Sequence, residues 1–246
     1  MKTVVVTGGA KGIGADITRA FHAAGYTVVV GSRSADGAEI GFSDRVRFRA
    51  CDVRRPEELH ALADFAVEST GRLDAWVNNA GFSKWCALDD LTEDFVDDMI
   101  RTNLHGVIFG CQAAARRMPD GGVIVNVSSL AGRRGSANNT AYCASKFGVT
   151  AVTQSLAKEL GGRGIRVNAV CPVYVVTAGL TEALQESVSP SGGDQEPYLA
   201  EFARSQSALG RLPTGGEVAD AVLFLTDGAH AVTAQSLNVD CGVMPF

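Results

Sequence analysis

Tyr142 and Lys146 form a pair of side chains that could move a proton. They lie four positions apart in a segment with helical periodicity, so both side chains fall on one face of the expected helix. A free phenol has a pKa of about 10, and lowering it to neutrality requires about 4 kcal/mol of preferential stabilisation of the phenolate. Because a neighbouring ammonium supplies part of that stabilisation, the pair could act as a general acid and base.

Two adjacent serines could hold the oxygen atom of a substrate beside this phenol. Ser128 and Ser129 come at the end of the apolar run that begins at Val123. A hydroxyl from either one could donate a hydrogen bond to a substrate oxygen. The residues alone leave the choice between them open. A tyrosine and a lysine at this spacing are common on helices. A catalytic role for the pair therefore has to be inferred from the surrounding elements as well.

Short β-branched runs alternate along the chain with segments of helical length. Most of the runs are apolar throughout, as in a parallel sheet whose two faces are both covered by helices. Strands are expected at Thr3–Thr7, Thr27–Val30, Val46–Cys51, Ala75–Asn78, Val123–Ser128, Arg166–Cys171 and Ser236–Val239, and helices near 13–24, 56–69, 93–117, 141–160 and 216–227. The pattern predicts an α/β fold, a doubly wound (Rossmann) parallel sheet of about seven strands in a single domain over 1–246.

One polar stretch interrupts this alternation. The segment Ala178–Leu212 contains the run Ser189-Pro190-Ser191-Gly192-Gly193 and follows the sixth expected strand. Long polar insertions at the end of a strand are often loops that cover a binding site. We therefore expect residues 178–208 to form a mobile lid.

A glycine-rich turn links the first strand to the first helix. The chain reads Thr7-Gly8-Gly9-Ala10-Lys11-Gly12-Ile13-Gly14. Glycines allow a tight turn and a close approach of the backbone to a pyrophosphate, whose charge then sits at the helix N-terminus. Polar residues also follow the third and fourth strands, where ligands bind in open α/β sheets. The residues expected to contact a dinucleotide are Gly8, Lys11, Gly12, Ile13, Gly14, Asp52, Val53, Asn79, Ala80 and Gly81.

The end of the second strand indicates which dinucleotide is preferred. Proteins that bind NAD(H) usually carry Asp or Glu at this point to hold the ribose 2′-hydroxyl, whereas a 2′-phosphate requires positive charge. Here the strand ends in Gly31-Ser32-Arg33, without a carboxylate, and Lys11 lies in the glycine turn. The guanidinium offers a planar fork and the ammonium a point charge for phosphate. The sequence therefore predicts NADP(H) in preference to NAD(H).

Composition and charge exclude several other classes of protein. The 22 basic and 27 acidic residues leave a net charge of −5, which argues against a nucleic-acid or membrane partner. There is no apolar run long enough to span a membrane and no cleavable apolar leader, so we expect a cytoplasmic protein. The six cysteines are scattered, without a CxxC pair or a histidine cluster. They are expected to be reduced packing residues, and no metal site is predicted.

Taken together, these motifs resemble the short-chain dehydrogenase/reductase family, in its single-domain branch of about 250 residues. The resemblance covers essentially the whole chain. It includes the glycine turn with its Gly8-x-x-x-Gly12-x-Gly14 spacing, Asn78-Asn79-Ala80-Gly81, Asn103, Ser129 and Tyr142-x-x-x-Lys146. Single-domain members of this family are dinucleotide-dependent oxidoreductases, so the resemblance implies hydride transfer between a nicotinamide ring and a carbonyl or carbinol carbon.

The resemblance also implies a role for each matching residue. Tyr142 would exchange a proton with the substrate oxygen, and Lys146 would lower the pKa of Tyr142 and hold the nicotinamide ribose. Ser129 matches the catalytic serine because the family places it thirteen residues before the tyrosine. Asn103 would anchor a water molecule in a proton relay.

The chain departs from the family pattern at three glycine positions. Val173, Ala234 and Cys241 stand where the family usually has glycine. The backbone of Val175 and the side chain of Thr177 still match the positions that hold the nicotinamide carboxamide. The departures are therefore expected to alter loop geometry and not the chemistry.

The resemblance leaves the substrate open. Basic and amide side chains are expected around the substrate pocket at Lys84, Arg133, Arg134, Asn138 and Asn139. Such a rim suits a ketone or secondary alcohol of a polar or sugar-like small molecule. An acyl-carrier-protein type of 3-oxoacyl thioester reductase is an alternative, for which Arg163 matches one of two basic docking positions while the other falls at Gly121-Gly122, with Arg116 and Arg117 nearby.

Three further expectations concern class and assembly. A non-catalytic dinucleotide-binding sensor or scaffold is an alternative of another class, but such a protein has no need for all four catalytic residues. An epimerase or dehydratase is disfavoured because no second substrate domain follows. The family usually assembles through the helices that carry Asn103 and Tyr142, so a homo-oligomer, tetramer or dimer, is expected.

Overall fold

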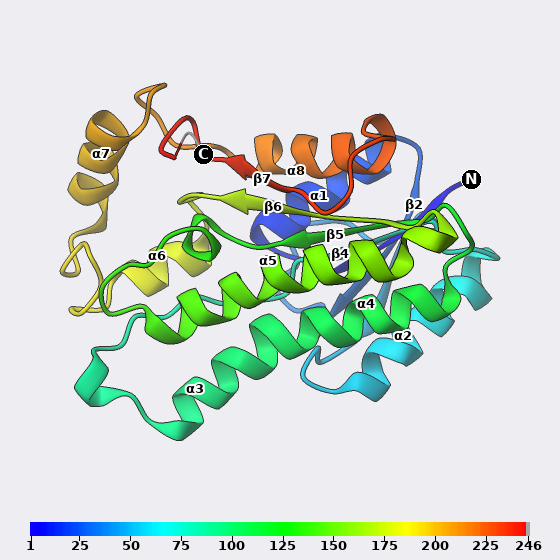
Figure 1. Cartoon of the computed structure of the whole chain (residues 1–246), viewed down its shortest axis with the longest axis horizontal. Helices are drawn as coiled ribbons and strands as arrows, with labels where there is room; N and C mark the ends of the chain where they lie inside the picture. Colours follow the sequence, from blue (N-terminus) through cyan, green and yellow to red (C-terminus); the bar gives the residue numbers. More distant parts are fainter. Residues whose placement is uncertain (245–246) are drawn as a thin grey trace.

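Seven short strands pair in parallel in the order β3-β2-β1-β4-β5-β6-β7 (Figure 1). The computed structural model describes residues 1–244. The strands are β1 (Thr3–Thr7), β2 (Thr27–Ser32), β3 (Val46–Ala50), β4 (Ala75–Asn78), β5 (Val123–Val127), β6 (Arg166–Pro172) and β7 (Ser236–Val239). The doubly wound sheet predicted from the sequence is confirmed, with boundaries shifted by one or two residues.

Eight α-helices in the described residues connect or cover the strands. They are α1 (Gly12–Ala23), α2 (Pro56–Thr70), α3 (Glu93–Ile100), α4 (Gly106–Arg117), α5 (Thr140–Leu160), α6 (Ala178–Leu184), α7 (Gln195–Gln206) and α8 (Gly215–Leu223). The helix expected over 93–117 is interrupted by a π-helical turn at Arg101–His105. A second π-helical turn, Phe224–Gly228, follows α8.

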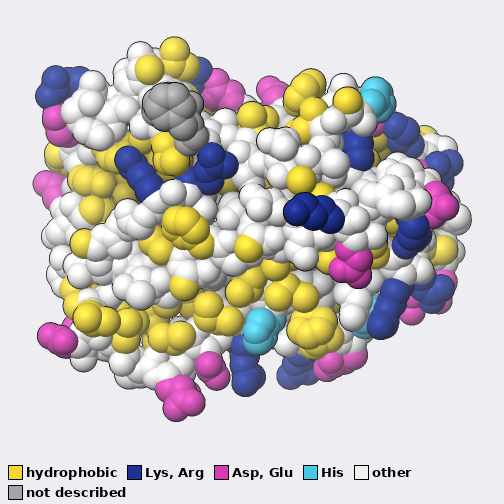
Figure 2. Space-filling view, in the orientation of Figure 1, with side chains coloured by type: hydrophobic (Ala, Val, Ile, Leu, Met, Phe, Trp, Pro, Cys, Tyr) yellow, Lys and Arg dark blue, Asp and Glu magenta, His cyan; other side chains and the backbone are white. Residues whose placement is uncertain are grey.

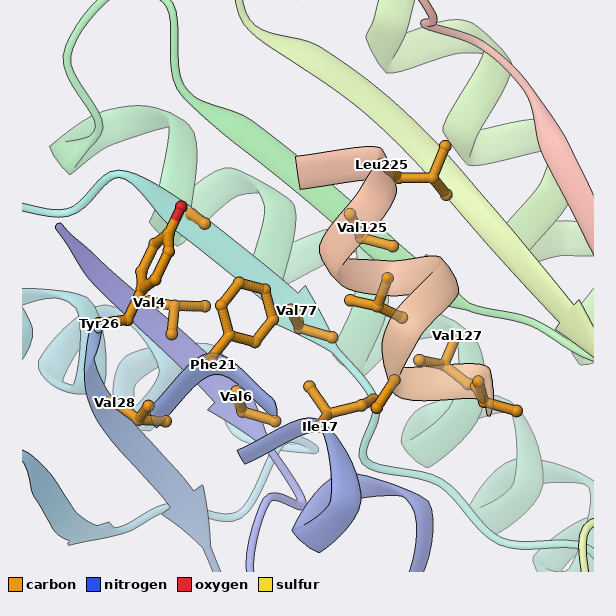
Figure 3. Close-up of a cluster of buried hydrophobic side chains, with 14 of the residues drawn as sticks. Val4, Val6, Ile17, Phe21, Tyr26, Val28, Val77, Val125, Val127 and Leu225 are labelled. Atoms are coloured by element: carbon orange, nitrogen blue, oxygen red, sulfur yellow. The ribbon is translucent and has the colours of Figure 1, made fainter. Parts of the chain in front are cut away.

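Both faces of the central strands are buried, which explains why most of the strands are apolar throughout, whereas the edge strand β3 contains Arg47 and Arg49. Val4 and Val6 point to the face covered by α1 and α8, where they pack in one core cluster with Phe21 (Figure 3). Val5 points to the opposite face and packs with Trp76 in a second cluster, on the side of α2, α4 and α5 (Figure 1). Alternate residues of the central strands therefore enter different cores, and both sets are mostly hydrophobic.

The polar segment expected to be a lid is largely helical. Residues 178–208 contain α6 and α7. These helices share a small apolar cluster that includes Trp85, Leu184 and Tyr198. The sequence reading missed these helices because they are short and their apolar residues face a small local cluster instead of the main core. Whether the segment moves stays a prediction.

Two findings bear on the expectations about membranes and disulfides. Among residues 1–244, no helix is both long and hydrophobic enough to cross a membrane. All six cysteines are free thiols, and four of them are buried: Cys51, Cys111, Cys143 and Cys171.

Two residues that replace family glycines adopt a left-handed backbone. Ala234 and Cys241 have φ angles of 63° and 54°. A residue with a Cβ atom is strained in this region, at a cost of about 1–2 kcal/mol. The turns on either side of β7 therefore adopt a backbone conformation that glycine favours. The Cβ atoms of these two residues strain that conformation.

We expect Ala234→Gly to raise the free energy of unfolding by about 0.5–1 kcal/mol, because relief of this strain exceeds the added freedom of the unfolded chain. The measurement is urea denaturation. The control is Ala200→Gly at an exposed position inside α7, which should lower stability by about 1 kcal/mol. A loss of stability in both variants would contradict the interpretation.

Candidate active site

One cavity of about 980 Å³ lies at the carboxyl ends of the strands, where the strand order changes direction between β1 and β4. This switch point is the usual ligand site of open α/β sheets. The cavity is lined by every residue expected to contact the cofactor: Gly8, Lys11, Gly12, Ile13, Gly14, Ser32, Arg33, Asp52, Val53, Asn79, Ala80, Gly81, Val175 and Thr177. Ser129, Tyr142 and Lys146 line it too, whereas Asn103 does not.

The glycine turn leaves β1 in a conformation that requires residues without side chains. Gly8 and Gly12 have φ angles of 65° and 53°. At Gly14 an added Cβ would lie 2.1 Å from the carbonyl oxygen of Gly8. The Asn79 amide donates to the carbonyl oxygens of Thr7 and Gly8, at 3.0 and 3.2 Å, and so joins β4 to the turn. This cradle at the start of α1 fits a pyrophosphate.

The end of the cavity beside β2 carries two cations and an unsatisfied hydroxyl. Ser32 Oγ is buried and has no hydrogen-bond partner among the described residues. Lys11 and Arg33 are exposed. The salt bridges within residues 1–244 involve neither of these two cations. These groups therefore fit a phosphate that needs both positive charge and hydrogen-bond donors.

The Asp52 carboxylate is held by a residue that the sequence analysis missed. Arg54 donates to it through Nε, at 3.0 Å, and through Nη2, at 2.6 Å. The same guanidinium reaches Asp98 at 2.9 Å. Hydrogen bonding from Arg54 holds the pKa of Asp52 below its ordinary value. Asp52 thus lines the cavity as expected, but an adenine amino group would have to share its oxygens with Arg54.

The loop after β6 lies against the glycine turn. Val175 is buried, and Thr177 caps α6 by accepting a hydrogen bond from the backbone N–H of Leu180 at 3.3 Å. An added Cβ at Gly12 would lie 3.4 Å from Thr177 Cγ2. The two loops therefore approach each other across the cavity, and a dinucleotide between them would contact both.

Helix α5 is attached by three consecutive residues, the last two of β5 and the one that follows it. Asn126 Nδ2 donates to Thr153 Oγ1 at 2.9 Å. The next residue, Val127, accepts a hydrogen bond from Lys146 Nζ at 2.9 Å. Ser128 Oγ then donates to the backbone carbonyl oxygen of Lys146 at 3.0 Å. These bonds determine how far the Tyr142 and Lys146 side chains extend beyond the sheet.

The structure distinguishes the two serines. Ser128 is 3% exposed, and its hydroxyl donates to the helix. Ser129 is partly exposed, and its hydroxyl accepts from the backbone N–H of Ala131 at 3.1 Å. Because that bond uses a lone pair and not the proton, the Ser129 hydroxyl can still donate to a substrate oxygen.

The electrostatics of the tyrosine and lysine differ from the simple expectation. Burial raises the pKa of Tyr142, and hydrogen bonding with Ser129 opposes that rise. Burial also lowers the pKa of Lys146 to about 8. The Lys146 Nζ atom lies 5.7 Å from the centroid of the Tyr142 ring. In the protein alone, burial therefore favours the protonated form of the Tyr142 phenol.

Asn103 acts on the site from behind the cavity wall. It is fully buried in the π-helical turn Arg101–His105, a feature often found at functional sites. Its Oδ1 accepts from Phe82 N at 3.0 Å, and its Nδ2 donates to Phe82 O at 2.8 Å. An added Cβ at Gly81 would lie 2.9 Å from Asn103 Oδ1 and 3.7 Å from Lys146 Nζ. Gly81 therefore lies close to both the Asn103 amide and the Lys146 ammonium.

Helix α7 contributes an aromatic wall. Tyr174 packs edge-on against Tyr198 and Phe202, with ring centroids 5.9 and 4.9 Å apart. The hydroxyl groups of Tyr174 and Tyr198 are 3.1 Å apart, and Tyr174 and Phe202 line the cavity.

Lys84 and Glu186 form a salt bridge of 3.9 Å between the segment after β4 and the turn after α6. The segment expected to be a lid thus contacts the site through both apolar and charged groups.

The polar rim is smaller than the sequence analysis expected. Of the five expected residues, the cavity is lined by Lys84, Arg134 and Asn139. Arg133 is directed elsewhere, since its Nη1 donates to the carbonyl oxygen of Ser236 at 3.1 Å. Asn138 donates instead to the carbonyl oxygen of Val188 at 3.0 Å. The expectation for these two residues was wrong because sequence neighbours in a tight turn point in different directions.

Glu39 also lines the cavity, although no sequence pattern identified it. Its Oε2 accepts a hydrogen bond from the backbone N–H of Gly12 at 3.0 Å. The residue lies in the irregular segment between β2 and β3, to which neither periodicity nor the strand-end rule applies. Its position depends on how that segment folds back over the glycine turn.

Comparison with known proteins identifies the family. A family model described as enoyl-(acyl carrier protein) reductase matches residues 8–244. D-threitol dehydrogenase of Mycolicibacterium smegmatis is 36% identical, with 98% of this chain and 92% of that protein covered. The chain belongs to the short-chain dehydrogenase/reductase family. The resemblance stated from the sequence motifs is therefore confirmed.

Other members of the short-chain dehydrogenase/reductase family are similar over equally long stretches. A 3-oxoacyl-[acyl-carrier-protein] reductase of Thermotoga maritima is 35% identical, with 99% of this chain and 98% of that protein covered. Among solved structures, an actinorhodin polyketide ketoreductase with NADPH superposes with a TM-score of 0.89 and 32% identity, covering 100% of this chain and 98% of that one. These similarities show an oxidoreductase of this family that binds a nicotinamide dinucleotide.

The geometry of the two serines predicts different effects of their removal. Ser129→Ala should lower kcat/KM by about 100-fold, because a donor to the developing charge on the substrate oxygen is lost. Ser128→Ala should lower the free energy of unfolding by about 1 kcal/mol with a much smaller effect on turnover. Cofactor turnover followed by absorbance, together with urea denaturation, measures both effects. The opposite pattern would assign the substrate contact to Ser128.

Proposed function

We propose that this chain is an NADP(H)-dependent oxidoreductase that interconverts a ketone and a secondary alcohol on a polar, sugar-like small molecule. The observation that supports it most strongly is that Ser129, Tyr142 and Lys146 line the same cavity as the glycine turn. A sensor or scaffold that only binds a dinucleotide has no use for a phenol, a hydroxyl and a buried ammonium in one place. The convergence of these groups therefore favours an enzyme.

The four catalytic residues have distinct roles in this proposal. Ser129 donates a hydrogen bond to the substrate oxygen, and Tyr142 gives a proton to that oxygen in reduction and takes it back in oxidation. Lys146, held by the carbonyl oxygen of Val127, places positive charge beside the phenol and favours the phenolate. Asn103 anchors a water molecule in the proton relay. The nicotinamide supplies or accepts the hydride when it is bound.

The cofactor preference rests on the charges beside β2. Lys11 and Arg33 line the cavity together with the unsatisfied hydroxyl of Ser32. A ribose 2′-phosphate would gain charge-assisted hydrogen bonds from all three groups. The similar ketoreductase structure contains NADPH, which supports the same choice here. Asp52 and Val53 would contact the adenine, whereas Val175 and Thr177 would contact the carboxamide.

The rim of the cavity favours a small polar substrate. Lys84, Arg134 and Asn139 offer hydrogen-bond donors beside the catalytic tyrosine. Tyr174 and Phe202 provide aromatic faces on which the carbon skeleton of a sugar or polyol can lie. The similarity to D-threitol dehydrogenase supports this substrate class.

A 3-oxoacyl thioester carried on acyl carrier protein is the second candidate, favoured by the similarity to the Thermotoga maritima reductase. The docking residue Arg163 argues against it. Its Nη1 and Nη2 both donate at 2.7 Å to the carbonyl oxygens of Ala115 and Met118, and its Nε donates to Asp120 at 3.0 Å. These internal bonds leave the guanidinium little capacity to bind an acidic partner.

We also propose a homo-oligomer that forms through α4 and α5. Figure 2 shows hydrophobic side chains among the charged ones on the face made by α3, α4 and α5. Phe147 on α5 is 45% exposed. A second copy of the chain would cover such side chains.

Tyr142→Phe tests the central assignment. We expect kcat to fall by at least about 1,000-fold because the proton donor is lost, while the Kd for NADPH changes by less than about threefold. Ketones, sugars, polyols and acyl thioesters are offered in turn, and absorbance of NADPH reports turnover. Retained turnover would refute the role of Tyr142, and turnover of acyl thioesters alone would favour the second candidate.

The cofactor preference has its own test. Wild-type kcat/KM should be at least about tenfold higher with NADPH than with NADH, and Arg33→Ala should reduce that ratio by about tenfold. Arg19→Ala serves as the control because Arg19 lies on α1 and does not line the cavity. A wild-type preference for NADH would overturn this part of the proposal.

A further inference from the structure

The segment between β2 and β3 folds back onto the glycine turn through two hydrogen bonds. Glu39 N donates to the carbonyl oxygen of Ala10 at 2.8 Å. The Glu39 carboxylate accepts from Gly12 N at 3.0 Å. Gly37 lies beside the loop as well, since an added Cβ there would lie 3.0 Å from Lys11 Nζ. These contacts place a negatively charged side chain at the start of α1, inside the cavity.

The position of this carboxylate conflicts with the charges around it. The backbone N–H of Gly12 is one of the donors left unsatisfied at a helix N-terminus, which favour an anion. Lys11 and Arg33 line the same cavity and lack salt-bridge partners among residues 1–244. A phosphate on the adenosine ribose would bind to the same two cations. A second anion bound here would therefore lie close to the Glu39 carboxylate or would have to displace it.

We propose that Glu39 is a specificity-determining residue of the dinucleotide site. Its carboxylate is held beside Lys11 by the bonds to Ala10 and Gly12, and it repels a 2′-phosphate that Lys11 and Arg33 would bind. Toward NAD(H), which has a ribose hydroxyl in place of that phosphate, the same carboxylate can accept a hydrogen bond, so its effect is less unfavourable. Glu39 thus weakens the preference created by Lys11 and Arg33. The inference rests on the proposed dinucleotide-dependent function.

Strand-end rules overlook this residue because they look for an acid directly after β2. The side chain there is Ser32, followed by Arg33. Glu39 reaches the site from farther along the loop, through the backbone bond to Ala10. A carboxylate can therefore influence the cofactor preference of this chain without occupying the usual position.

The test is Glu39→Gln, which keeps an oxygen that can accept from Gly12 N and removes only the charge. Isothermal titration with NADPH and NADH gives the two Kd values without any turnover. We expect the Kd for NADPH to fall by about fivefold and the Kd for NADH to change by less than about twofold, because only NADPH adds a 2′-phosphate to the anions near the carboxylate. The gain should shrink as NaCl is raised, because salt screens exposed charges.

Two controls isolate the effect. Asp36→Asn removes a charge from an exposed residue of the same loop that does not line the cavity, and it should leave the ratio of the two Kd values within about twofold. Adenosine 2′,5′-bisphosphate and adenosine 5′-monophosphate, titrated into the same variants, report on the 2′-phosphate alone. The gain in Glu39→Gln should appear only with the bisphosphate.

The outcomes separate this inference from the proposed function. Equal changes in affinity for NADPH and NADH, or none, would show that Glu39 only caps α1 and would overturn the inference. Failure of the wild-type protein to bind either dinucleotide would overturn the proposed function instead. If the wild type prefers NADH and Glu39→Gln shifts binding toward NADPH, the role of Glu39 stands and the proposed NADP(H) preference falls.

Discussion

The attachment of α5 to the carboxyl end of β5 is the constraint on which the site depends. Asn126, Val127 and Ser128 each form a hydrogen bond with this helix, and Lys146 supplies two of the partners. An ammonium buried without such bonds would be costly. The Lys146 side chain is therefore tied to β5, and Tyr142, one helical turn earlier, has a defined place above the sheet. Because the glycine turn follows β1 in the same parallel sheet, its position relative to this tyrosine is determined as well.

The same burial that positions the catalytic pair also sets its resting charge. Desolvation raises the pKa of Tyr142 and lowers that of Lys146, so both groups are driven toward their neutral forms. The phenol is thus stored with its proton, which suits a general acid for carbonyl reduction. A general base for alcohol oxidation needs extra positive charge near the ring.

The substrate end of the cavity is built differently from the cofactor end. Backbone groups of the glycine turn and the strand ends form much of the cradle, which requires glycine at Gly8, Gly12 and Gly14. The opposite wall consists of side chains from α7 and from the segment after β4, including Tyr174, Phe202 and Lys84. Such surfaces vary freely between proteins of one fold. Family membership therefore shows the class of chemistry, whereas the choice of substrate depends on these side chains.

The sequence by itself determined the parallel sheet, the strand ends that meet at the site, and the residue types around the cavity. Apolar runs and motif spacing are local patterns. The expected role of Gly8 or of Tyr142 can therefore be inferred from the few residues that surround it in the sequence. Only the tertiary structure decided which serine is free to donate, that Arg54 holds Asp52, that Arg133 points away from the cavity, and that residues 178–208 contain two helices. It also placed Glu39 on the N-terminus of α1. These features depend on contacts between segments distant in sequence or on the direction of single side chains in a turn, and periodicity contains neither.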